Sequence, residues 1–545
     1  MRYLSLLLLA SIALAYNPYA DYVLCRLHQE REPLKAKEYC LRALEKAPTP
    51  SLYVDVVRLE MQLKNSEKAL KIALDFKTKY PDLSEPYILL HSIHTARREQ
   101  DSALKVLEEG YIKNPQSKEV MVFLAEEYLR RGEPLKAKGV LQNLAEVSPD
   151  NPLPYFMLAR IALSEGKQEE AIDFLQKSLK VNPTFPAGFI TLGGIYEQRG
   201  EYSRAEDLYK DILKQDPGNR NALERLGNLY TIRGRYEEAK EVYKRLMELY
   251  AESTHLYQYS LVLIRAGEQG EARSILERLY EENPENPDVA YTYAMLLEVL
   301  KERDRALAIY TSLQKRLGNN PRIIERLAGI YIDKKDYAKA EELLRLGLSI
   351  EPNSLQLNLM MGHLLKERER YEEALGYIEK AIQIDHKDYR GYFLRAIVYD
   401  NMGKIVSAES DLRKALELRP EDPELLNHLG YSLLLWYQAV RLEEAELLIK
   451  KALEKEPENP AYIDSMAWVL YHRGDYRGAY ELLLKALEKE KEDPVLYEHM
   501  GDVLSKLGRE KEAQENYRRA YELLTSGKKG EPNQRERLKG KLKGL

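Results

Sequence analysis

One alanine recurs along this chain every 33 to 37 residues, and this spacing constrains the fold more than any other feature. The pattern is clearest in residues 186–219. Apolar and small residues in its first half follow the i, i+3, i+4, i+7 spacing of one helix face: Phe189, Leu192, Gly193 and Tyr196. Gly200 interrupts this face, and Ala205 belongs to a second apolar face that ends before Pro217. The pattern predicts two antiparallel helices that cross at the small residues Gly193 and Ala205.

The same pattern of two amphipathic helices separated by a turn recurs over most of the chain. The alanine of the second helix recurs fifteen times, as Ala36, Ala69, Ala103, Ala137, Ala171, Ala205, Ala239, Ala272, Ala306, Ala340, Ala374, Ala408, Ala445, Ala479 and Ala513. Prolines follow many of the second helices, because proline cannot continue a helical hydrogen-bond ladder. A chain of 545 residues is also too long for one ordinary core. We therefore expect an all-α fold in which about fifteen helix pairs stack on one another.

The repeat unit resembles the tetratricopeptide repeat, a family with a known consensus. The unit has 34 residues, with Leu192-Gly193, Tyr196, Ala205, an aromatic at Tyr209 and Pro217 at the positions of that consensus. The resemblance implies a right-handed superhelix, an α-solenoid, whose concave groove is lined by the first helix of each repeat. It also implies a protein-binding role without catalysis.

The chain divides by pattern into five parts. Residues 1–15 read as a signal peptide, residues 17–185 as N-terminal repeats, 186–422 as central repeats, 423–527 as C-terminal repeats and 528–545 as a basic tail. One C-terminal repeat carries three extra residues within 435–441, which we interpret as a longer turn between two helices.

The first residues have the features of a secretory signal. Arg2 precedes an uncharged apolar run, and Ala13 and Ala15 are the small residues that a signal peptidase reads. The run is about half the ~20 residues that span a bilayer, so we favour cleavage after Ala15 over an uncleaved anchor. The mature protein is then expected to be periplasmic or secreted. In such a compartment Cys25 and Cys40 are permitted to pair, although two buried thiols fit the sequence equally well.

Composition and motifs argue against an enzyme. Charged residues are mixed in sign and the net charge is −5, which does not favour binding to nucleic acid. Zinc-protease, Cys-x-x-Cys and nucleophile-elbow motifs do not occur. His91 and His94 form a His-x-x-His pair, which we assign to packing and not to metal binding. We expect no cofactor and no metal.

Positions 5, 9 and 12 of each repeat are expected to face the groove, and two stretches place apolar side chains there. The first consists of Tyr257, Leu261 and Ile264, followed by Tyr291 and Met295. The second consists of Phe393, Ile397, Tyr431, Leu434, Trp468 and Tyr471, beside the polar Asn427 and Asp464. An aromatic stripe with amides and carboxylates suits an extended peptide or a partner helix. For the first stretch, packing inside the superhelix is an equal alternative, whereas for the second we favour a partner site.

The tail after residue 527 has no repeat pattern. It holds seven Lys or Arg and two Glu, a balance of +5. We expect a solvated, mobile segment. Contact with anionic lipid, and so peripheral membrane contact, or with an acidic partner is the alternative.

The C-terminal repeats show a closer resemblance. Residues 427–433, 459–471 and 499–504 are similar to a bacterial envelope group that includes the outer-membrane lipoprotein adaptor of a carboxyl-terminal processing protease. The resemblance implies a non-enzymatic scaffold or adaptor in the cell envelope that presents substrates to such a periplasmic protease. A scaffold for exopolysaccharide export or outer-membrane assembly is the alternative.

Overall fold

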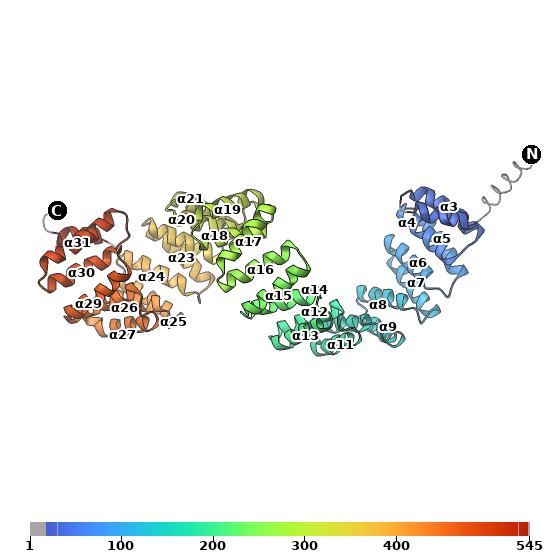
Figure 1. The fold of residues 1–545 in the computed structure, drawn as a ribbon, viewed down its shortest axis with the longest axis horizontal. Coiled ribbons are helices and arrows are strands. Elements are labelled where there is room, and N and C mark those ends of the chain that lie inside the picture. Colours follow the sequence, from blue (N-terminus) through green and yellow to red (C-terminus); the bar gives the residue numbers. More distant parts are fainter. Residues whose placement is uncertain (1–17, 30, 532, 543–545) are drawn as a thin grey trace, which may run out of the picture. The chain divides into compact units, whose positions relative to one another are not determined.

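A computed structural model describes residues 18–29, 31–531 and 533–542, and every regular element in these ranges is a helix. The signal-peptide prediction for residues 1–15 lies outside the described residues. The helices form fifteen consecutive pairs (Figure 1). The prediction of an all-α stack of about fifteen repeats is therefore confirmed. Among the described helices, none combines the length and the apolar character that crossing a membrane requires.

The first helices of the pairs have similar lengths and are α2 (Pro18–His28), α4 (Pro50–Gln62), α6 (Glu85–Ala96), α8 (Lys118–Arg130), α10 (Leu153–Ser164), α12 (Pro186–Gln198), α14 (Arg220–Ile232), α16 (Ser253–Ala266), α18 (Pro287–Val299), α20 (Pro321–Asp333), α22 (Leu355–Glu367), α24 (Tyr389–Asn401), α26 (Pro423–Tyr437), α28 (Pro460–Arg473) and α30 (Pro494–Lys506).

The second helices are α3 (Pro33–Lys46), α5 (Ser66–Lys79), α7 (Gln100–Lys113), α9 (Pro134–Val147), α11 (Gln168–Val181), α13 (Tyr202–Gln215), α15 (Tyr236–Leu249), α17 (Gln269–Glu282), α19 (Arg303–Leu317), α21 (Tyr337–Ile350), α23 (Tyr371–Ile384), α25 (Ile405–Leu418), α27 (Leu442–Lys455), α29 (Tyr476–Lys489) and α31 (Glu510–Thr525). A short 3₁₀ helix, η1 (Gln438–Arg441), precedes α27, and α32 (Gln534–Lys541) follows the last pair.

The recurring alanine is the point of closest packing within each pair. All fifteen of these alanines are completely buried. The facing residue of the first helix is equally constrained, because a Cβ added to Gly193 would overlap the hydroxyl of Tyr209 on α13. Gly200, with φ of +73°, forms the left-handed turn that joins these two helices. Small residues thus set the distance between the paired helices, as the pattern predicted.

The chain divides into two compact units between Ile275 and Leu276, within α17. Each unit is described by itself below. The division of the repeats at residues 185 and 422 is a matter of sequence pattern and stays a prediction.

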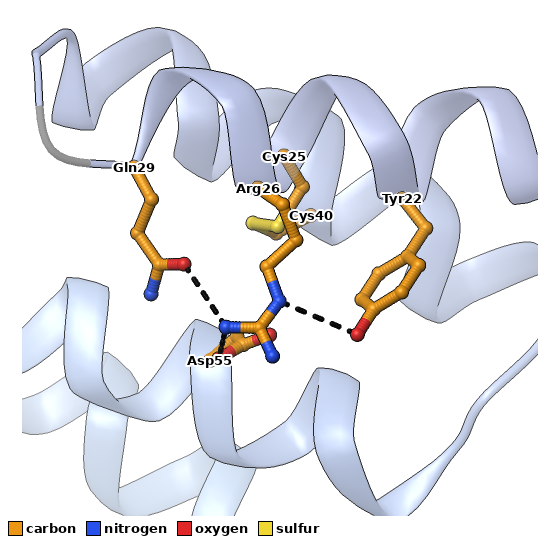
Figure 2. The surroundings of a disulfide bond; sticks show 6 residues. All are labelled: Tyr22, Cys25, Arg26, Gln29, Cys40 and Asp55. Atoms are coloured by element: carbon orange, nitrogen blue, oxygen red, sulfur yellow. Dashed lines mark hydrogen bonds and ion pairs between the residues drawn. A yellow bond between two sulfur atoms is a disulfide. The ribbon is translucent and has the colours of Figure 1, made fainter.

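Cys25 on α2 and Cys40 on α3 form a disulfide within the first pair, with Cα atoms 4.9 Å apart. Both residues are completely buried. Figure 2 shows Arg26 beside this bond, where its guanidinium lies 3.3 Å from the buried carboxylate of Asp55 on α4. The disulfide therefore joins α2 to α3, and the ion pair between Arg26 and Asp55 joins α2 to the first helix of the next pair.

Two expectations for the C-terminal end are wrong. The extra residues at 435–441 do not form only a turn, because α26 continues to Tyr437 and η1 takes up the remainder. Trp436 in the added helical turn donates a hydrogen bond of 2.7 Å to Asp400 on α24. The basic tail is not a solvated segment over its described residues, because α32 packs against α31 and Leu538 is completely buried. The described residues of the tail also contact α22, α26 and α30.

Candidate functional site

Two residues of the second predicted stretch, Tyr431 and Trp468, border a cavity of about 560 Å³ in the C-terminal unit. Helices α26, α28 and α30 supply one wall through Tyr431, Trp468 and His499. The tail supplies another through Arg537 and Lys541. The cavity thus lies between the first helices of the last three repeats and the chain's own C-terminal segment.

Three rings stack across two repeats beside this cavity. Tyr471 and Trp468 on α28 lie parallel with centroids 4.6 Å apart. The other face of Trp468 lies 4.0 Å from the ring of His499 on α30. The indole Nε1 of Trp468 is buried and has no hydrogen-bond partner among the described residues. A buried indole usually finds an acceptor, so this donor is an unsatisfied polar group beside the cavity.

His499 is the charged centre of the site. Its Nδ1 lies 2.8 Å from the nearer carboxylate oxygen of Asp464, and both side chains are buried. Burial alone would lower the pKa of His499, but the charge and hydrogen bond of Asp464 outweigh it and raise this pKa to about 9. The imidazole is therefore a cation at neutral pH, and the face of Trp468 stabilises it by a cation–π contact.

Tyr431 connects this centre to the tail. Its hydroxyl lies 3.3 Å from Nε2 of His499 and donates a hydrogen bond to Glu531. Burial and the nearby carboxylates raise the pKa of Tyr431 well above its ordinary value, so the hydroxyl remains a donor.

A neutral histidine lies at the other end of the cavity. Phe393 on α24 contacts His428 edge to face, with centroids 5.1 Å apart. Burial lowers the pKa of His428 to about 4, so this ring is uncharged. On α26, Oδ1 of Asn427 is buried with no hydrogen-bond partner among the residues that the structure describes. Of the residues that carry these two unpaired groups, only Trp468 borders the cavity.

The predicted residues fall into three groups. Tyr431, Trp468 and the neighbouring Tyr471 are half-buried and gather around His499, whereas Phe393, Ile397 and Asn427 are half-buried on α24 and α26. Asp464 is buried and bonded to His499, so it holds the site together and is not an open contact. The prediction for Leu434 is wrong, because it is completely buried in the core cluster with Leu433. In the added turn of α26, Trp436 borders the cavity and donates its hydrogen bond to Asp400.

The first predicted stretch is divided between the two units, and its interpretation as one site stays a prediction. Tyr257 and Leu261 lie in the N-terminal unit and are half-buried, whereas Tyr291 and Met295 lie in the C-terminal unit. Tyr291 packs edge to face on Tyr310 of its own pair at 5.7 Å. Met295 is 37% exposed. Tyr257 and Leu261 therefore belong to one unit, and Tyr291 and Met295 belong to the other.

Sequence reasoning missed the acidic side of the groove. Glu498 and Asp502 on α30 stand at positions 5 and 9 of the last repeat, the positions that selected Asp464 and Trp468 one repeat earlier. The sequence prediction followed aromatic and apolar side chains at these positions, and the last repeat has none at either of them. Reading the same positions for charge would have found both.

Comparison with known proteins identifies the repeats. Segments matching the tetratricopeptide repeat cover residues 122–186, 196–260, 263–329, 321–354 and 349–526, together well over half of the chain. The TPR repeat-containing protein PA4667 of Pseudomonas aeruginosa is 32% identical over 175 residues, which are 31% of this chain and 29% of that protein. Protein bimA of Emericella nidulans is 26% identical over 93 residues, 17% of this chain and 12% of that protein. The matched region thus spans less than a third of either curated relative.

Two solved structures resemble the chain at low identity. The crystal structure of the APC/C hetero-tetramer Cut9-Hcn1 covers 86% of this chain and 98% of that one, with 14% identity and a TM-score of 0.43. A tetratricopeptide repeat protein from Parabacteroides merdae covers 46% of this chain and 98% of its own, with 17% identity and a TM-score of 0.40.

Proposed function

Because the chain belongs to the tetratricopeptide-repeat family, whose members bind protein partners, we propose that it is a non-enzymatic scaffold of the bacterial cell envelope. A segment of a partner protein binds in the C-terminal groove, which is the surface around the cavity lined by Tyr431, Trp468, Glu498 and Asp502. The observation that carries this proposal is the cavity bordered by Trp468 and Tyr431, with charged side chains of α30 and of the tail around it. Aromatic side chains in a half-buried groove are the usual anchors of protein interfaces.

Export is supported by two features at the N-terminal end. The apolar run before Ala15 has the form of a signal peptide. The disulfide between Cys25 and Cys40 suits an oxidising compartment, where such bonds persist. We therefore propose a periplasmic or secreted location after cleavage at Ala15.

The specific form of the proposal is an adaptor for a carboxyl-terminal processing protease. Its support is the resemblance of residues 425–524 to the envelope adaptor group. In this role the groove holds one protein while another is delivered to the protease. Peripheral membrane contact by the basic tail requires the tail to leave the groove that it occupies in this structure.

Co-purification from a cell-envelope extract of the native organism tests the adaptor role. The tagged full chain is expected to recover a processing protease in stoichiometric amount, as identified by mass spectrometry. Recovery of export-channel or outer-membrane assembly components without a protease would contradict the adaptor role. It would favour the alternative, a scaffold for exopolysaccharide export or outer-membrane assembly.

A further inference from the structure

We infer that the C-terminal groove is selective for a basic, leucine-containing protein segment, and that residues 528–542 of this chain are its resident competitor, which such a partner must displace. The inference deepens the proposed function, since it rests on the groove being a partner site. It follows from the way the tail, whose described residues are 528–531 and 533–542, lies against Glu498, Asp502, Tyr431 and Glu367.

Two cations of α32 engage the acidic pair of α30. Nζ of Lys541 lies 2.9 Å from Glu498 and 2.7 Å from Asp502. The guanidinium of Arg537, one helical turn earlier, lies 3.2 Å from Glu498. Although burial opposes ionisation of Glu498, these two cations hold its pKa below the ordinary value. The carboxylates stand at groove positions of the last repeat, so the tail occupies the surface that faces a partner.

Apolar and backbone contacts seat the same helix. Leu538 is completely buried between the two cations, and Leu542 follows it into the core cluster of the last repeats. Gln534 donates a hydrogen bond of 2.9 Å to the carbonyl of Pro494, at the start of α30. The side chain of Gln514 on α31 donates one of 3.1 Å to the carbonyl of Lys541. These are the contacts of a short amphipathic ligand in a groove.

The segment before α32 continues along the groove. Glu531 accepts the hydrogen bond from Tyr431 on α26, two repeats earlier. Lys529 reaches Glu367 on α22, four repeats before the last, at 3.0 Å. The described tail therefore follows the groove across several repeats, which a cap on the last helix pair alone would not do.

The charge of the groove defines the class of partner. Glu498 is 2% exposed in this structure. A carboxylate covered to this extent without a cation costs several kcal/mol, so any segment that covers Glu498 must bring a Lys or Arg of its own. The buried position of Leu538 adds the requirement for a leucine or similar side chain next to that cation. An acidic or neutral segment has no Lys or Arg to pair with Glu498 and is therefore not expected to bind.

The tail is also suited to exchange. Lys529 is 79% exposed, and ion pairs of exposed side chains are weak and screened by salt. An isolated helix of eight residues such as α32 is marginal in water. The tail therefore competes chiefly through its high effective concentration as part of the same chain, and a partner with the same chemistry and more contacts displaces it.

Binding of a fluorescent peptide of residues 528–545 to the full-length chain tests this inference. The Arg537→Glu/Lys541→Glu variant places negative charges against Glu498 and Asp502 and should release its own tail. It is expected to bind the peptide at least tenfold more tightly than the unmodified chain at low salt, with affinity falling as salt rises. The matched variant Arg535→Glu/Lys539→Glu changes two exposed residues of the same helix by the same charge and should bind like the unmodified chain.

Equal peptide affinity of the first variant and the unmodified chain would overturn the inference, as would tight binding to the matched variant. A second measurement needs no variant. In the ¹⁵N-labelled unmodified chain, excess peptide should accelerate amide hydrogen exchange in residues 535–542, and unchanged exchange at saturating peptide would also overturn it. Neither assay contains an envelope partner, so success here with no protein recovered from the extract would contradict the proposed function alone.

Discussion

Gly193 shows how much a single residue controls in this fold. A Cβ at this position would overlap the hydroxyl of Tyr209, whereas a Cβ on the adjacent Gly194 meets no atom within 4 Å. Gly193→Ala is expected to cost about 1–3 kcal/mol in the free energy of unfolding, because the pair must open to admit the methyl group. Gly194→Ala is the matched control and should be neutral or stabilising by up to about 1 kcal/mol. Urea unfolding measures both, and equal effects would contradict the close helix contact.

His499 makes the C-terminal repeats sensitive to pH. Its pKa is about 9 in the folded protein and about 6.5 in the unfolded chain, so folding favours the cation. The stabilisation is complete below about pH 6.5 and is lost as the pH rises through about 9, a change of up to about 3 kcal/mol. Hydrogen exchange of α28 and α30 between these pH values, corrected for intrinsic rates, measures the loss. Asp464→Asn removes the source of the raised pKa and should abolish this pH dependence; if the variant keeps it, another group is responsible.

The residues of the site could be predicted in part. Tyr431, Trp468 and Tyr471 follow from counting positions in the repeat, since that count depends only on helix geometry. Leu434 was misplaced because it packs into the core cluster with Leu433 and Ile449, a contact that a count of positions does not reveal. The charge state of His499 depends on Asp464, 35 residues earlier, and no local pattern reveals that contact.

At the scale of elements, the helix pairs were predictable and the exceptions were not. The periodic alanines mark all fifteen second helices, because each must fit against its partner regardless of the neighbouring repeats. The tail carries no such periodicity, and its charges resemble those of a solvated segment. Its docking depends on Glu498 and Asp502, whose position on the groove is defined only once the repeats have stacked.

The first helix pair is joined by a disulfide in addition to its helix packing. The bond joins residues 15 apart and removes conformational freedom from the unfolded pair, which is worth about 3 kcal/mol. Reduction should therefore accelerate amide exchange in α2 and α3 while leaving α30 and α31, which lack cysteine, unchanged. Unchanged exchange in α2 and α3 would mean that helix packing alone holds the pair.

At the scale of the whole molecule, the described chain consists of stacked helix pairs, and the candidate partner surface lies on the last repeats. Stacked repeats transmit little strain beyond their neighbours, so a substitution in the groove should affect binding without unfolding distant pairs. Leu447 on α27 is an exposed apolar residue outside the cavity lining and serves as a control for loss of apolar area.

Recovery of envelope proteins by the tagged full chain, compared between Trp468→Ala and Leu447→Ala by quantitative mass spectrometry, tests the central claim most directly. Circular dichroism checks that both variants keep the helical content of the unmodified chain. The account predicts that Trp468→Ala loses at least nine-tenths of the recovered partner, while Leu447→Ala retains it. Equal recovery by the two folded variants would contradict the assignment of the C-terminal groove as the partner site.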